Sequence, residues 1–407
     1  MPESPPPPGP AAAPRQRGVY VVLLRTPNVG GQALLGLLAQ ITQGAAPLGL
    51  VLVVRGATGS LIAAGAVSAA LWVGAAVARP IQGRLIDRHG TQLVMLVCGP
   101  VHAAALVAVV VVAWAGGGVW VMVMFSALAG LMLPPVSVVM RVEWGRHVPA
   151  HERTAAFSLV FLTQEIALVT GPLLIASLVG FSAGIALITA ATVSGVATIG
   201  FAALGTTEGS DHEVPVRADG KRATAARSVL AVAFLLGGTL GIFQVAAPSL
   251  ALARGVPAVG GVLIAAVSVG GISGALVYGG IRWRADPATR LILLLIVLAV
   301  ATTPLVAALP LAAVGVLLAL GGMALNPAFA TTSLLIDRHG GSRGAEAFGW
   351  MSTAVGGGTA AGNAIAGALA QRNGFPPAFF AAAVAAYAAV VISGSGLWLA
   401  RSRISRR

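Results

Sequence analysis

Long apolar runs alternate with short polar breaks along nearly the whole chain. Most runs are about 20 to 26 residues long, the length that an α-helix needs to cross a bilayer. Within a run the apolar positions are continuous and do not alternate with polar ones, which argues against a membrane β-barrel. The pattern predicts an all-α protein with twelve membrane-spanning helices, at residues 29–54, 58–79, 93–114, 119–141, 154–179, 183–204, 228–250, 257–280, 290–309, 311–334, 346–370 and 376–400.

The composition supports a membrane protein. Of the 407 residues, 57% are hydrophobic and only 9% are charged, whereas soluble proteins carry about 25% charged residues. The formal net charge is +13, yet the basic residues are scattered between the apolar runs and form no patch with interleaved aromatic residues. This distribution argues against nucleic acid as a partner and in favour of the lipid bilayer.

The positions of the basic residues predict the orientation in the membrane. With the N-terminus inside, all but three of the 25 Lys and Arg residues fall in cytoplasmic segments; the exceptions are Arg55, Arg254 and Arg372. Because cytoplasmic loops carry an excess of Lys and Arg, we expect a multi-pass protein of the cell membrane with both termini in the cytoplasm. The predicted parts are a disordered cytoplasmic tail (1–28), a six-helix bundle (29–204), a cytoplasmic linker (205–227), a second six-helix bundle (228–400) and a basic cytoplasmic tail (401–407).

Enzymatic classes find little support in the sequence. A Walker A loop needs Gly-Lys followed by Ser or Thr, and the only lysine stands in Gly220-Lys221-Arg222. Ser273 lies in a G-x-S-G sequence, but no later predicted helix contains a histidine to act as its base. We interpret these small residues as sites of close helix packing, and expect neither catalysis nor a cofactor or metal.

Residues 83–90 read Gly-Arg-Leu-Ile-Asp-Arg-His-Gly, in the predicted loop between the second and third helices. The pattern G-x-x-x-D-R-x-G resembles the signature of the major facilitator superfamily, secondary transporters built of two six-helix halves. The resemblance implies that Asp87 binds the start of a helix in the opposite half and latches the cytoplasmic gate, as a carboxylate can at a helix N-terminus. Gly83 would allow close helix approach, and Arg88 and Gly90 complete the motif. The alternative is a solvated loop without a gating role. The last six residues of the motif, 85–90, occur again at 335–340, and we interpret this repeat as coincidence or convergent loop chemistry.

Glu165 is the one carboxylate that the pattern places deep within a span. It lies about 16 Å along the fifth helix, counted from residue 154 at about 1.5 Å per residue. An unpaired charge at that depth costs about 2.5–3.5 kcal/mol, so Glu165 should face the bundle interior. A carboxyl that exchanges a proton as its solvent access changes is what proton-coupled transport needs. The alternatives are that Glu165 binds a cationic substrate, or only hydrogen-bonds to Gln164 or another helix.

Two other titratable residues are candidates for proton coupling. The end of the fourth helix, residues 141–145, resembles the R-x-x-Q-G motif of the family, with Trp144 in place of Gln, and the resemblance associates Arg141 with proton coupling. The alternative for Arg141 is an anchor at a helix end. His102, in the third helix, is a candidate relay partner, with a hydrogen-bonded packing role as the alternative.

The resemblance also nominates cavity residues, because the first, fourth, seventh and tenth helices line the cavity in this family. The candidates are Gln40, Gln43, Gln244 and Asn326, with hydrogen bonding between helices as the alternative role for each. Gly171-Pro172 resembles part of a fifth-helix motif of the family's drug exporters, although Thr163 stands in place of its upstream glycine.

We therefore expect a secondary transporter that moves a small amphipathic compound outward by alternating access, driven by protons. An importer of a sugar or another metabolite with the same fold is the main alternative. A non-transporting membrane sensor and an intramembrane enzyme are weaker alternatives.

Overall fold

The computed structural model describes residues 19–26, 28–205, 220–307, 309–339, 343–373 and 375–401. These residues are almost entirely helical, as the apolar runs predict. The elements are α1 (Val19–Arg25), α2 (Val29–Ala39), α3 (Ile41–Thr58), α4 (Leu61–His89), α5 (Thr91–Trp114), α6 (Val119–Leu131), α7 (Val136–His147), α8 (Arg153–Leu178), α9 (Ala183–Leu204), α10 (Gly220–Ala253), α11 (Pro257–Gly280), α12 (Pro287–Thr302), the 3₁₀-helix η1 (Thr303–Val306), α13 (Leu311–His339), α14 (Gly344–Asn373) and α15 (Phe375–Arg401).

The predicted tails and linker fall partly outside this range. Residues 1–18, 206–219 and 402–407 are not among the described residues. The last part of the predicted N-terminal tail is nevertheless helical, as α1, and it is held to the molecule by Leu23, which is fully buried, while Val21, Val22 and Leu24 are exposed. The predicted linker is also shorter than expected, since α10 begins at Gly220.

Two of the predicted spans are each divided into two α-helices, and a third, 290–309, continues from α12 into the 3₁₀-helix η1. The first breaks between α2 and α3 at Gln40, whose side-chain Nε2 donates to the Gly36 carbonyl at 2.9 Å. The fourth breaks between α6 and α7 at Pro134 and Pro135. Proline lacks a backbone N–H and disfavours helical geometry in the residue before it, so two consecutive prolines end α6.

The second predicted span continues further than expected, and this corrects the placement of the G-x-x-x-D-R-x-G motif. The motif forms the last two turns of α4 and not a loop. Pro80 does not end this helix, although it cannot donate to the Ala76 carbonyl. Instead, the hydroxyl of Thr353 on α14 donates to that carbonyl at 3.2 Å. Gly90 ends α4 with a φ of 85°, a left-handed conformation that favours glycine.

Eleven helices or helix pairs in the described residues are long and apolar enough to cross a membrane. The remaining long helix, α14, contains seven glycines together with polar residues such as Ser352, Thr353 and Asn363. Its glycines serve close packing: a Cβ on Gly358 or Gly362 would collide with the backbone of α10. Together the eleven candidates and α14 correspond to the twelve predicted spans.

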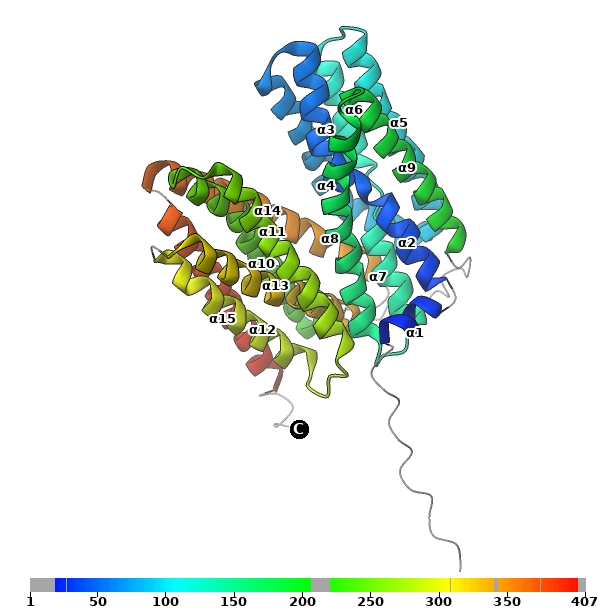
Figure 1. Ribbon diagram of the computed structural model, residues 1–407. Helices are drawn as coiled ribbons and strands as arrows, with labels where there is room; N and C mark the ends of the chain where they lie inside the picture. The colour runs from blue at the N-terminus through cyan, green and yellow to red at the C-terminus, as the bar shows by residue number, and fades with distance from the viewer. Residues whose placement is uncertain are drawn as a thin grey trace, which may run out of the picture.

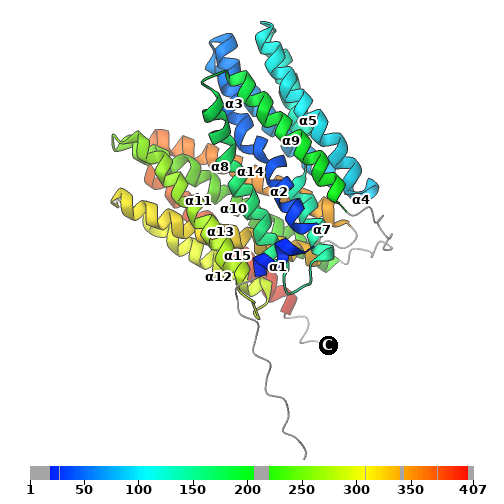
Figure 2. The same ribbon diagram turned by 45° about the vertical axis from the view of Figure 1, so that its right-hand side comes forward.

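The helices form two groups, α2–α9 and α10–α15 (Figures 1 and 2). The groups meet at the end of the molecule where α1 lies and diverge toward the other end. We call the first of these ends the closed end. Across it, α4 packs against α14, and α8 packs against α11 and α13.

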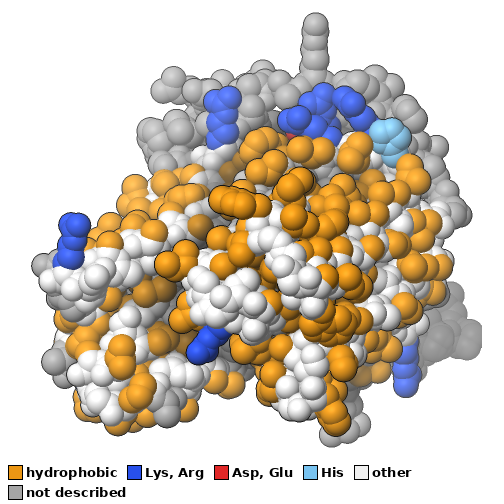
Figure 3. All heavy atoms as spheres, turned by 90° about the horizontal axis from the view of Figure 1, so that it is seen from above, with side chains coloured by type: hydrophobic (Ala, Val, Ile, Leu, Met, Phe, Trp, Pro, Cys, Tyr) orange, Lys and Arg blue, Asp and Glu red, His pale blue; other side chains and the backbone are white. Residues whose placement is uncertain are grey.

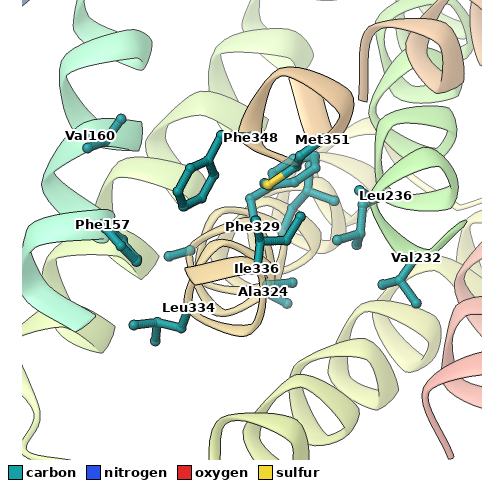
Figure 4. Packing of buried hydrophobic residues seen from close by; sticks show 14 of the residues in the cluster. Phe157, Val160, Val232, Leu236, Ala324, Phe329, Leu334, Ile336, Phe348 and Met351 are labelled. Carbon is teal, nitrogen blue, oxygen red and sulfur yellow. The ribbon is translucent and has the colours of Figure 1, made fainter. Parts of the chain in front are cut away.

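The outer surface suits a lipid environment. Many large hydrophobic side chains of the helices are exposed, among them Ile62, Trp120 and Phe181. Figure 3, which views the molecule from above, shows hydrophobic side chains over much of that face and a few Lys and Arg side chains, mostly toward its margins. Inside, a hydrophobic core continues from one group of helices into the other. Figure 4 shows Phe157 of α8 near Phe348 of α14 and Phe329 of α13.

Candidate functional site

One face of α8 looks toward the opposite half. Phe157, Phe161 and Glu165 follow one another at intervals of four residues, which places them on the same side of the helix. Phe157 packs edge-on against Phe348 at a ring distance of 6.1 Å, and Phe161 stacks on Phe329 at 5.6 Å. Glu165 therefore lies one turn further along α8 than the aromatic contacts of the closed end.

Glu165 is held by neutral donors from the other half. The side-chain Nδ2 of Asn326, on α13, donates to Glu165 Oε1 at 3.2 Å. The side chain of Ser268, on α11, also lies near this carboxyl. The carboxyl is half-buried and Asn326 is buried. The structure thus joins the candidate coupling residue and one candidate cavity residue in a single contact between the halves.

Arg141, on α7, contacts the part of α8 that precedes Glu165. Its guanidinium is centred 4.7 Å from the Phe161 ring and 6.0 Å from the Phe348 ring, and Nη2 is 3.4 Å from Gln164 Oε1. Arg141 is only 3% exposed. This burial argues against a surface anchor at the helix end, a position that Arg146 and His147 occupy instead. Arg141 therefore contacts Gln164, the residue before Glu165 on α8.

His102 lies elsewhere, within the N-terminal group of helices. Nδ1 pairs with the Ala129 carbonyl at 2.7 Å and Nε2 with the Thr42 hydroxyl at 3.0 Å, and the side chain is fully buried. Both nitrogens are therefore occupied by neighbours from α6 and α3. This geometry fits the packing alternative better than a relay to Glu165.

The remaining cavity candidates occupy different environments. Gln40 is buried at the α2–α3 break, where its Oε1 has no partner among the described residues. Gln43 is half-buried on α3 and Gln244 is exposed on α10. An apolar groove between α4 and α6 is lined by none of the four candidates; it is formed by Ala66, Ala69, Ala70, Val73, Gly74, Val77, Ala127 and Leu131.

The motif at the end of α4 makes the contact that the resemblance implies. The backbone N–H groups of Ala345 and Glu346, in the first turn of α14, donate to Asp87 Oδ1 and Oδ2 at 3.0 and 2.8 Å. These are N–H groups that the helix itself leaves unpaired. A Cβ on Gly83 would lie 2.7 Å from the Glu346 Cα, so the close approach requires glycine.

The neighbouring motif residues differ in role. Arg84 Nε donates to Glu346 Oε1 at 2.7 Å, which adds an ion pair to the same junction. Arg88 is exposed, and Gly90 supplies the left-handed end of the helix. Thr91 stands where the family has a basic residue, and its hydroxyl donates to Glu143 Oε1 at 2.7 Å.

Sequence reasoning missed several groups at the closed end. Glu143 is buried, with only 5% of its surface exposed, and it also accepts a hydrogen bond from Gln32 at 3.1 Å. Tyr20, in the segment predicted to be disordered, donates to the Ala275 carbonyl of α11 at 2.7 Å. Burial raises the pKa of the Tyr20 hydroxyl, so it remains a neutral donor. Its position in the short apolar stretch 19–24 was the available signal.

The chain resembles known membrane transporters in sequence profile and in fold. Residues 31–345 match the profile of the Major Facilitator Superfamily. No curated protein sequence matches the chain significantly.

Solved structures share the fold at low identity. The chain is similar to a bacterial homologue of the iron transporter ferroportin in an outward-facing state, with a TM-score of 0.70 and 18% identity over 92% of this chain and 99% of that chain. It is also similar to the human organic anion transporter MFSD10 (TETRAN), with a TM-score of 0.70 and 16% identity over 94% and 100% of the two chains. For the E. coli fucose:proton symporter FucP, the TM-score is 0.68 at 12% identity over 92% and 99%.

Proposed function

The chain belongs to the major facilitator superfamily, and from that premise we propose that it is a proton-coupled exporter of small amphipathic compounds. Proteins of this family are secondary transporters and not enzymes, and they carry small molecules across a bilayer. The proposal adds the coupling ion, the direction and the class of substrate. We place the protein in the cell membrane with both termini in the cytoplasm, as the distribution of Lys and Arg indicates.

The observation that carries the proposal is the hydrogen bond between Glu165 and Asn326. A half-buried carboxyl in a membrane protein is stable when it is protonated or hydrogen-bonded. The two halves must separate at this point when the closed end opens, and Glu165 then loses its Asn326 donor. Binding and release of a proton by Glu165 is therefore linked to the movement of the halves.

Arg141 has a supporting part in this proposal. Its guanidinium rests on Phe161 from its own half and on Phe348 from the other half. Opening of the closed end removes the Phe348 contact and changes the exposure of the Arg141 guanidinium, which contacts Gln164, the residue before Glu165. A proton relay through His102 belongs to the same hypothesis, but both ring nitrogens of His102 already have partners within the N-terminal group of helices.

The substrate class follows from the polar groups available. Gln43 and Gln244, with Asn326, offer amide groups without fixed charge, and the surrounding spans are apolar. An amphipathic compound with few charges suits amide groups set among apolar spans. Import of a metabolite is the second candidate, because a fucose:proton symporter shares the fold.

A comparison of cells with and without the protein, at two external pH values, tests the direction. We expect cells that express the protein to tolerate more ethidium and to retain less of it, with the larger effect at the lower external pH, where the inward proton gradient is steeper. Higher retention of the dye in expressing cells would favour the importer and contradict efflux.

A further inference from the structure

The hexapeptide Leu-Ile-Asp-Arg-His-Gly occurs twice, at residues 85–90 and 335–340. The first copy ends α4 and the second ends α13. The two helices are not equivalent under the two-fold relation of the halves, so the repeat does not follow from an internal duplication. Its aspartates are Asp87, described above, and Asp337.

Asp337 also reaches the opposite half at the closed end. Its Oδ2 accepts a hydrogen bond from Arg153 Nη1 at 2.9 Å, and Arg153 is the first residue of α8. The two side chains are 19% and 32% exposed, which makes the pair partly shielded from solvent. A Cβ on Gly145 of α7 would lie 2.8 Å from Asp337 Oδ1, so the carboxylate is seated against two helices of the N-terminal half.

The two aspartates have matching surroundings. Each lies in the last turn of a long apolar helix, each contacts the beginning of a helix in the other half, and each has a glycine at the contact: Gly83 for Asp87 and Gly145 for Asp337. The beginning of α8 is further held by Arg290 of α12, whose Nη1 donates to the Thr154 hydroxyl at 3.3 Å. The α8 junction therefore has its own set of bonds, separate from the α14 junction.

We propose that Asp337 and Arg153 form a second gate latch, which holds α8 to the C-terminal half as Asp87 holds α14 to the N-terminal half. The closed end opens only when both junctions separate, so each latch adds to the stability of the closed arrangement. Because the two junctions share no side chain, their contributions add in free energy. The inference depends on the movement of the two halves and not on the substrate or the coupling ion.

The test measures exposure of the closed end by thiol labelling. The chain has a single cysteine, Cys98, which Cys98→Ala removes. Ser158→Cys then places a reporter at a fully buried position of α8 beside Gly279 of α11. Maleimide labels this thiol in the purified protein only while the closed end is open, so its labelling rate reports the open population.

We expect Asp337→Asn and Arg153→Gln each to increase the labelling rate about two- to fivefold, the range for a partly exposed ion pair. The matched control is Asp286→Asn, which breaks the adjacent Asp286–Arg338 pair (3.0 Å) within the C-terminal half. This control should leave the rate unchanged. A protein with both Arg153→Asp and Asp337→Arg can re-form the ion pair in exchanged order. Its labelling rate should therefore be lower than that of either single variant and close to that of the parent, which carries only Cys98→Ala and Ser158→Cys.

Three results would overturn the second latch. One is equal labelling of the Asp337→Asn and Asp286→Asn proteins. Another is failure of the exchanged pair, in a protein that elutes as the parent does on size exclusion, to lower the rate. The third is a combined Asp87→Asn and Asp337→Asn protein that labels no faster than Asp87→Asn alone, since independent latches multiply their effects on the rate.

Discussion

His102 illustrates how a buried titratable side chain is stabilised by neutral partners. Its two ring nitrogens pair with the Ala129 carbonyl and the Thr42 hydroxyl, and Thr42 lies 3.4 Å from the Ser194 hydroxyl. These bonds join α5 to α6, α3 and α9 within one half. The side chain thus has a structural task that does not depend on the movement of the halves.

Replacement of His102 by Ala tests this task. We expect the free energy of unfolding to fall by about 1–3 kcal/mol, because the partners of the ring are left buried and unpaired. Thermal unfolding in detergent measures the loss, with exposed His151→Ala as the control. Unchanged stability together with an altered pH dependence of transport would instead support the relay role.

Glu165 shows what the sequence can and cannot predict at the residue scale. Its place within a span follows from counting residues along an apolar run. Its partner does not, because Asn326 is 161 residues away and meets it only through the packing of α8 against α13. The same reason applies to Asp337, because the local sequence shows the repeated hexapeptide but not the contact with Arg153, which is 184 residues away.

At the scale of elements, prolines have different effects on the predicted spans. Pro134 and Pro135 divide one span, whereas Pro80 leaves α4 continuous. The difference lies in the partner of the freed carbonyl, because Thr353 of α14 donates to the Ala76 carbonyl. A bond from another helix is not readable from the α4 sequence, and so the length of α4 was underestimated.

The same bond makes a prediction about the gate. Thr353→Val removes a donor that crosses between the halves and should weaken the closed arrangement by about 0.5–1.5 kcal/mol. Thr359→Val is the matched control, since Thr359 donates only to the Val355 carbonyl of its own helix. The thiol reporter at position 158 should label faster in the first variant only. Equal labelling of the two variants would mean that the bond does not hold the gate.

At the scale of the whole molecule, twelve spans in two groups follow from apolar run lengths and from the alternation of basic residues. The contacts at the closed end required the structure, because they join residues from opposite halves. Tyr20 with Ala275 and Asp87 with Ala345 are separated by more than 250 residues. These contacts lie on one side of Glu165 along α8, so the carboxyl stands at the boundary between the closed end and the diverging helices.

That position makes Glu165 the most direct test of the whole account. In proteoliposomes with an imposed pH gradient, the wild-type protein should drive flux of ethidium against its own gradient. Glu165→Gln should abolish this driven flux but allow exchange of dye between the two sides to continue, whereas Asp286→Asn should behave as the wild type does. Driven flux of unchanged rate and pH dependence in the Glu165→Gln protein would contradict proton coupling at this residue.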